Sequence, residues 1–131
     1  MKEYAPTVLR IGLSCVVIWF GFSQLTNPTM WTSMVPLYAT ALVPIPVSIL
    51  VLGNAIFELL FGFALLLGLY TRFVAGILTL HLAHIVTIVG YNAIGVRDFG
   101  LTLAMLAVFL HGPSRYSIDS AQGSLVQGDV K

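Results

Sequence analysis

The sequence predicts an all-α membrane protein: an antiparallel up-down bundle of four helices, with a short interfacial segment between the first two. Composition is the first reason. Of the 131 residues, 58% are hydrophobic and only 8% are charged, whereas soluble domains carry roughly 25% charged residues. The second reason is that no Asp, Glu, Lys or Arg occurs between Arg10 and Glu58. The net charge of +1 offers no basic face, so we expect no nucleic-acid partner.

Four stretches are apolar and long enough to cross a lipid bilayer, which takes about 20 residues. Because the connections between the later stretches are short, consecutive spans are expected to lie antiparallel and side by side. Together they form one membrane domain, residues 1–112. The expected spans are about 7–25, 48–70, 73–91 and 98–112.

Residues 26–47 differ from the spans because prolines interrupt them. Asn27 followed by Pro28 is typical of a helix start. Trp31 and Tyr38 are residue types that gather at membrane surfaces. We therefore expect a short amphipathic segment that lies at the membrane interface.

The distribution of Lys and Arg predicts the orientation. Four spans place the N-terminus, the turn at 70–72 and the polar tail at 113–131 on one side of the membrane. That side carries Lys2, Arg10, Arg72, Arg115 and Lys131, and the other carries only Arg97. Both termini are therefore expected in the cytoplasm. The first span lacks a cleavage site and is expected to stay in the mature protein. The Ser-, Gly- and Gln-rich tail is expected to be largely disordered.

Polar residues within the spans are the candidate functional residues, because an ionisable group in a bilayer is costly. Glu58 and His84 each lie 13 residues from Thr71. At 1.5 Å per residue they are expected at one depth on adjacent helices. Asn54 lies one helical turn from Glu58, and His81 lies one turn from His84. The sequence thus predicts a buried polar centre of Glu58, His84, His81 and Asn54.

Three interpretations of this centre remain open. The side chains could hydrogen-bond each other and fix the helix register. They could form a proton relay, or polar contacts for a quinone or another small ligand. Alternatively, His81, His84 and Glu58 could hold a metal, but helical histidines without a third firm ligand are weak support. A haem is not expected either, because His111 lies at another depth.

Four other residues carry expectations. Arg97 and Asp98 are expected as an ion pair at the start of the fourth span, with Asp98 suited to the helix dipole; their charge could also dock a partner at the membrane rim. Arg10 is expected to reach lipid headgroups, and Gln24 to bond a neighbouring helix. The single cysteine, Cys15, is expected to be buried as a small apolar residue.

No CxxC pair and no dinucleotide-binding motif occurs, so the chain is not expected to be a redox enzyme on its own. Electrons would have to travel through a bound quinone or a partner.

Several short motifs follow one another along most of the chain. They are Arg10-Ile-Gly12, Trp19 to Leu25, Gly53 to Leu59 (Gly-x-x-x-x-Glu-Leu), Leu67 to Arg72, Arg97-Asp98 and Gly112 to Asp119. In this order and spacing they resemble the DoxX family of small four-span membrane proteins. Many members carry a Lys where this chain has Gln24, so a role that rests on that charge is not expected here.

The resemblance implies a four-helix bundle in the inner membrane of a bacterium or the membrane of an archaeon. Some relatives are associated with redox systems, as partners of thiosulfate:quinone oxidoreduction or of oxidative-stress enzymes. The resemblance therefore implies an accessory or quinone-proximal subunit with a protein partner, or a homo-oligomer. The alternative is a non-catalytic scaffold or a carrier of a small lipophilic molecule, without a redox role.

Overall fold

The protein is built from helices joined by short connections. A computed structural model of the chain describes residues 4–128, with side chains for residues 4–123. The elements are α1 (Ala5–Thr26), η1 (Pro28–Met34), α2 (Leu37–Leu42), α3 (Val47–Leu67), α4 (Thr71–Val89), α5 (Ala93–His111) and α6 (Ile118–Gly128). Helices α1, α3, α4 and α5 are long and apolar enough to cross a membrane. The chain is a multi-pass membrane protein with four spans, as predicted.

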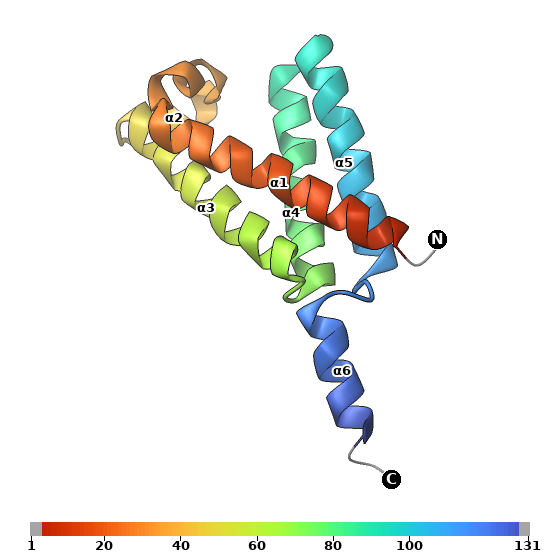
Figure 1. Cartoon of the computed structure of the whole chain (residues 1–131). Coiled ribbons are helices and arrows are strands. Elements are labelled where there is room, and N and C mark those ends of the chain that lie inside the picture. Colours follow the sequence, from red (N-terminus) through yellow and green to blue (C-terminus); the bar gives the residue numbers. More distant parts are fainter. Residues whose placement is uncertain (1–3, 129–131) are drawn as a thin grey trace.

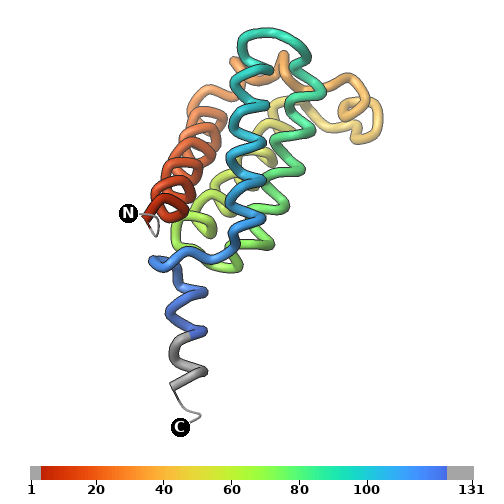
Figure 2. Tube along the Cα trace, turned by 90° about the vertical axis from the view of Figure 1, so that its right-hand side faces the viewer, coloured from red at the N-terminus to blue at the C-terminus, as the bar shows by residue number. Residues whose placement is uncertain are grey.

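The four long helices form two pairs. Helix α1 packs along α3, and α4 packs along α5, all antiparallel to their neighbours in sequence. The pairs meet near the α3–α4 turn and diverge towards the opposite end (Figure 1). The η1–α2 segment (Pro28–Leu42) lies at this wide end, whereas α6 extends away from the narrow end (Figure 2). The predicted bundle and its interposed short segment are confirmed.

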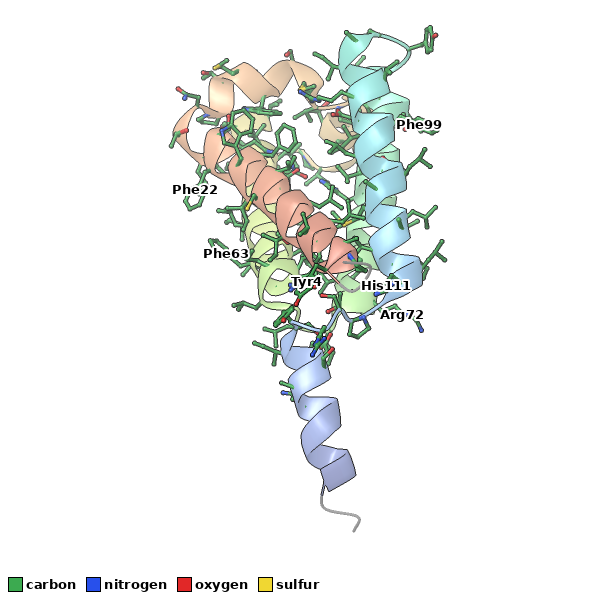
Figure 3. The ribbon with its side chains drawn as sticks, turned by 45° about the vertical axis from the view of Figure 1, so that its right-hand side comes forward. Tyr4, Phe22, Phe63, Arg72, Phe99 and His111 are labelled. Carbon is green, nitrogen blue, oxygen red and sulfur yellow. The ribbon has the colours of Figure 1, made fainter. Side chains whose placement is uncertain are left out.

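The hydrophobic core lies where the two pairs meet. Its buried residues come from all four long helices: Leu13, Val17, Leu65, Val74, Ala75, Leu78, Leu82, Met105 and Val108. Large apolar side chains also cover the outside, and Phe22, Phe63 and Phe99 project outward (Figure 3). Cys15 is exposed too, so the prediction of a buried cysteine was wrong. Burial is not required of an apolar residue here, because lipid tails are as apolar as a protein core.

Helix α5 begins five residues earlier than the predicted span. The side-chain oxygen of Asn92 accepts hydrogen bonds from the backbone N–H groups of Ile94 (2.9 Å) and Gly95 (3.0 Å), and this cap fixes the helix start. Arg97 and Asp98 therefore lie in the second turn. Their ion pair is confirmed, with 2.8 Å between Arg97 Nη2 and Asp98 Oδ1. The prediction that they mark the helix start was wrong, because Asn92 caps α5 earlier.

Arg10 is buried at the narrow end, with 2% of the residue exposed. Its Nη1 donates to the carbonyl oxygens of Leu65 (2.6 Å) and Leu66 in the last turn of α3. Its Nη2 donates to the Tyr116 carbonyl at 2.6 Å, and its Nε donates to Ser114 Oγ at 3.3 Å. The expectation that Arg10 reaches lipid headgroups was wrong. The last carbonyls of a helix lack partners and carry the negative end of its dipole, so they hold the guanidinium inside.

The α3–α4 turn requires a glycine. Leu69 N–H donates to the Ala64 carbonyl (2.9 Å) and Gly68 N–H to the Leu65 carbonyl (3.1 Å), which is the Schellman arrangement at a helix end. Gly68 has φ +71°, and a Cβ there would lie 2.4 Å from Ser117 Cβ. A side chain at position 68 would therefore be strained and would also push the tail off the bundle.

The polar tail folds back onto this turn. The Asp119 carboxylate accepts hydrogen bonds from the backbone N–H groups of Tyr70 (2.8 Å) and Thr71 (2.7 Å), and from the Thr71 hydroxyl (2.7 Å). These N–H groups begin α4, where a negative charge suits the helix dipole. The expectation of a largely disordered tail was wrong for α6. The tail lacks apolar periodicity, but its first residues are held by backbone groups that composition does not reveal.

The Asp119 contact predicts a pH-dependent stability of the narrow end. Burial alone would raise the pKa of Asp119, but hydrogen bonds from Thr71 and Tyr70 and the nearby Arg10 charge outweigh it and leave the pKa below its usual value. A carboxylate with a lowered folded-state pKa stabilises the fold above its unfolded pKa, about 3.9, and loses this contribution as the pH falls through the folded-state value. We therefore expect proteolysis at residues 112–120 to accelerate only below about pH 4.

Asp119→Asn is the control for this prediction. The amide cannot ionise, so proteolysis of the variant should already be faster at pH 7 and should change less between pH 7 and pH 3. The other carboxylates titrate equally in both proteins, so their effect cancels when the two proteolysis profiles are compared. An unchanged pH profile in Asp119→Asn would contradict the assignment.

Candidate functional site

A cavity of about 290 Å³ lies between the two helix pairs at the wide end. Helices α1, α3, α4 and α5 and the η1–α2 segment all contribute to its wall. Most of the lining is apolar, for example Leu82, Ile85 and Ile88 of α4. The polar and charged lining residues are Gln24, Asn54, Glu58, His81, His84, Arg97 and Asp98, together with Tyr38 and Trp31. An apolar chamber with a few convergent polar groups is the usual form of a small-molecule site.

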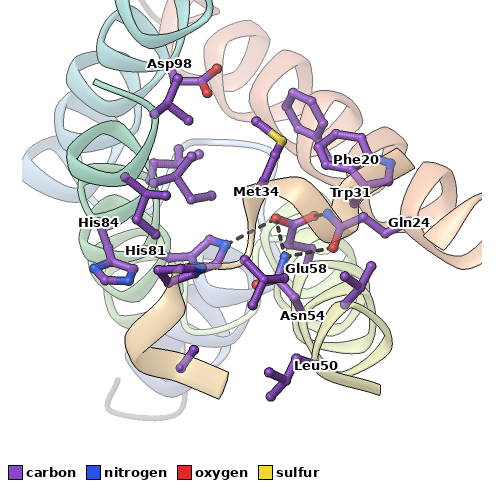
Figure 4. A pocket seen from close by; sticks show the side chains of 18 of the residues that line it. Phe20, Gln24, Trp31, Met34, Leu50, Asn54, Glu58, His81, His84 and Asp98 are labelled. Atoms are coloured by element: carbon purple, nitrogen blue, oxygen red, sulfur yellow. Dashed lines mark hydrogen bonds and ion pairs between the residues drawn. The ribbon is translucent and has the colours of Figure 1, made fainter. Parts of the chain in front are cut away.

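A hydrogen-bonded network forms the polar wall of this cavity (Figure 4). Glu58 Oε2 accepts a hydrogen bond from the Gln24 side-chain amide at 2.7 Å. Glu58 Oε1 lies 3.1 Å from both the Asn54 amide nitrogen and His81 Nε2. Asn54 also donates to the Gln24 carbonyl oxygen at 2.8 Å. The network joins α1, α3 and α4, and it saturates a carboxylate whose side chain is only 5% exposed.

The charge of this network depends on one partner. Gln24 and Asn54 are neutral amides, so only His81 can carry a charge opposite to that of Glu58. Suppose that His81 donates its Nε2–H to Glu58. If Nδ1 also carries a proton, the positive imidazolium and the negative carboxylate sum to zero charge; if it does not, the pair carries one negative charge.

His81, and not His84, is the histidine beside Glu58. The sequence count measured both depths from Thr71 and treated residues 68–70 as helical. In the structure these residues form the turn, so Glu58 lies nine residues before Leu67 and the matching residue on α4 is close to position 81. The prediction that Glu58 pairs with His84 was wrong, because the turn adds no rise along the helix axis.

His84 bonds the short segment at the wide end. Its Nε2 lies 2.5 Å from the Tyr38 hydroxyl, and the two rings meet edge to face with centroids 6.0 Å apart. His84 is exposed, whereas His81 is partly buried one turn earlier. The four predicted polar residues thus line one cavity, but they divide into a Glu58 network and a separate Tyr38–His84 contact.

The cavity is also lined by Arg97, Asp98 and Trp31. Arg97 is held by Asp98 and also lies over the Phe20 ring, 5.3 Å from its centroid, which is a cation–π arrangement. The indole N–H of Trp31 is buried without a hydrogen-bond partner. A buried unpaired donor costs about 1–3 kcal/mol, so a ligand with an acceptor atom would be stabilised there. Among the described residues, no group of three His, Cys, Asp or Glu side chains could hold a metal.

Gln24 is the member of the network that the sequence did not place in the candidate site. Its expected bond to a neighbouring helix is confirmed, because it contacts both Asn54 and Glu58 of α3. Its place near the C-terminal end of α1 is the signal that places it opposite Asn54. A depth count from the turn at 70–72 compares only the second and third spans, so it leaves Gln24 of the first span unplaced.

Comparison with known proteins gives one match. A family model described as DoxX matches residues 5–91, a range that covers α1, η1, α2, α3 and α4. No curated protein and no solved structure matches the chain.

Proposed function

This chain belongs to the DoxX family, and we propose that its cavity binds a lipid-soluble molecule of the quinone class, as part of an accessory subunit of a membrane redox system. The observation that carries this proposal is the cavity itself: about 290 Å³ of mainly apolar space bordered by a buried carboxylate network. Such a chamber suits a molecule with an apolar body and a polar head.

The polar head would meet two kinds of group. Trp31 offers a buried N–H without a partner, which suits a carbonyl oxygen of the ligand. Glu58 and His81 can pass a proton, which suits a head group that gains protons when it is reduced. A quinone takes up two electrons and two protons to become a quinol. The electrons would come from a protein partner, and this chain would bind the ligand and support the proton transfer.

We also propose the orientation that the Lys and Arg distribution predicts, with both termini cytoplasmic. The narrow end would then face the cytoplasm, and the cavity would lie towards the outer half of the membrane. An impermeant thiol reagent added to intact cells would then fail to label a cysteine at position 120 in a Cys15→Ser background. Labelling of position 120 would show that the proposed orientation is wrong and that the narrow end faces away from the cytoplasm.

A second function fits the same cavity. A carrier or scaffold would hold a lipophilic molecule without changing its oxidation state, and the apolar lining supports this equally well. The two functions differ in the affinities that they require for quinone and for quinol. A site shifts the equilibrium between quinone and quinol only if it binds one of them more tightly than the other. Equal affinity for quinone and quinol would favour the carrier.

Fluorescence can test the binding directly because the chain has two tryptophans. Trp31 lines the cavity, whereas Trp19 is 62% exposed and does not line it. In a Trp19→Phe variant, Trp31 is the only reporter. We expect menadione, a naphthoquinone probe without an isoprenoid chain, to quench its emission saturably in detergent or nanodiscs.

The matched control is Trp31→Phe, which leaves only Trp19. Menadione dissolved in the detergent or lipid should quench Trp19 linearly, without saturation, because that side chain faces outward. Identical quenching curves for the two variants would contradict the proposed binding site.

A further inference from the structure

The η1–α2 segment covers the cavity: η1 contacts α1 and α3, whereas α2 makes no comparable contact with a long helix. Neither η1 nor α2 contains a buried residue. Six of its residues nevertheless line the cavity, including Trp31, Met34 and Tyr38. The segment thus forms a whole wall of the chamber with side chains that remain partly or fully exposed. A wall with so little buried surface is the part of a fold that opens at the lowest free-energy cost.

Few hydrogen bonds and ring contacts join this segment to the long helices. Among the described residues, the hydrogen bond between Tyr38 and His84 is the only one that joins it to another element. The Phe20–Trp31 pair adds an edge-to-face ring contact, with centroids 5.8 Å apart. In Figure 4, His84 extends towards the ribbon of the short segment, away from the Glu58 network. The η1 part of the segment is therefore held against α1 and α3, whereas the α2 part is tied to α4 by a single polar contact.

Helices α3 and α4 and the short segment all line the cavity at the wide end. Helices α3 and α4 follow one another in the chain, but they diverge from their common turn (Figure 1). At the wide end the Tyr38–His84 contact bridges α2 to α4, while the short connection of residues 43–46 joins α2 to the start of α3. The short helix thus lies across the gap between α3 and α4, where a lipid-soluble molecule would enter from the bilayer.

We propose that the η1–α2 segment is a lid over a lateral entrance between α3 and α4, and that the Tyr38–His84 hydrogen bond is its latch. This inference rests on the proposed function for the kind of molecule that enters, but not for the motion of the lid. Breaking the latch exposes the apolar chamber to the membrane interior. The lid closes over the bound molecule and brings Trp31 against it.

Weakening the latch should speed ligand exchange in both directions. In the Trp19→Phe background, we expect Tyr38→Phe to raise the association and dissociation rates of menadione by about fivefold each, as expected for loss of one hydrogen bond. The two rates should rise together, because the fraction of molecules with an open lid enters both of them. Stopped-flow quenching of Trp31 measures both. The control is Tyr91→Phe, because Tyr91 is fully exposed and lies outside the cavity lining.

Locking the latch should have the opposite effect. A Tyr38→Cys/His84→Cys pair in the Cys15→Ser background can be joined by a short reducible bis-thiosulfonate. This spacer takes the place of two rings whose centroids are 6.0 Å apart. We expect menadione association to slow at least about tenfold in the bridged protein, more than the roughly fivefold change expected for the hydrogen bond alone. Cleavage of the bridge by a reductant, which is removed before menadione is added because it reacts with quinones, should restore the rate. Exchange that is unchanged by the bridge would overturn the lid.

A ligand-free measurement separates this inference from the proposed function. Ile85 lines the cavity, so a cysteine at position 85 in the Cys15→Ser background reports opening through its reaction with N-ethylmaleimide. Tyr38→Phe should accelerate that reaction. Faster labelling without saturable menadione quenching would support the lid and refute the quinone site. If menadione quenches Trp31 saturably but Tyr38→Phe changes neither the labelling rate nor the exchange rates, the quinone site is supported and the lid is refuted.

Discussion

Arg10→Met is expected to lower the free energy of unfolding by about 3 kcal/mol or more, because buried acceptors would lose their donor. The Leu66 and Tyr116 carbonyls receive hydrogen bonds from the guanidinium, and methionine fills a similar volume without any donor. The negative end of the α3 dipole would also lose its positive partner. Equilibrium unfolding in detergent, followed by circular dichroism, measures the loss.

Two variants control this prediction. Arg10→Lys keeps the charge but not the forked geometry that reaches three carbonyls and a hydroxyl, so it should recover only part of the stability. Arg72→Met removes an arginine whose hydrogen bond to the Leu110 carbonyl is exposed and 3.4 Å long, so it should cost less than about 1 kcal/mol. Equal losses for Arg10→Met and Arg72→Met would show that the buried contacts contribute little.

Glu58→Gln is expected to leave the fold nearly intact and to weaken menadione binding at least about tenfold, an effect equivalent to losing one charged hydrogen-bonding group. The hydrogen-bonded network can accommodate an amide in place of the carboxylate at position 58. If the Gln24 and Asn54 amides both flip, the new amide at position 58 donates to Gln24, Gln24 donates to Asn54, and His81 still donates to position 58. Only the Asn54–Glu58 bond is lost, so the free energy of unfolding should change by about 1 kcal/mol.

Glu58→Leu is the contrasting variant. Leucine leaves the donors of Gln24, Asn54 and His81 without the carboxylate that they share. Buried donors without partners cost about 1–3 kcal/mol each, so this variant should be clearly destabilised. If Glu58 only holds helices together, Glu58→Gln will bind menadione as well as the parent protein. That result would refute a ligand role for the carboxylate and leave it with a structural role.

The resemblance motifs acquire a physical meaning from the fold. Arg10 near the start of α1, the Leu67 to Arg72 turn and the Gly112 to Asp119 segment all meet at the narrow end. Arg10 stabilises the carbonyl end of α3, and Asp119 stabilises the amide end of α4. Opposite charges thus serve the two opposite helix ends at one turn. No motif alone indicates this, because the contacting residues are far apart in the chain: Arg10 and Tyr116 are separated by 106 positions, and Thr71 and Asp119 by 48.

The sequence determined the membrane spans, their antiparallel order and the polar residues of the cavity. These follow from local properties: apolar length, short connections and the cost of an ionisable group in a bilayer. Glu58, Asn54 and His81 were found because each interrupts an apolar helix. Helix ends were less certain, as Asn92 shows, because a cap depends on which backbone groups a side chain reaches.

Only the tertiary structure decided which of these polar groups meet. Moving the partner of Glu58 from His84 to His81 is a change of one helical turn, and it depends on three turn residues that add no rise. Likewise, the inward position of Arg10 and the fold of the tail depend on carbonyl and amide groups of other helices. Backbone hydrogen-bonding capacity is the same at every residue, so a sequence does not show where it is left unsatisfied. The three-dimensional packing of the helix ends shows which backbone groups remain unsatisfied and which side chains reach them.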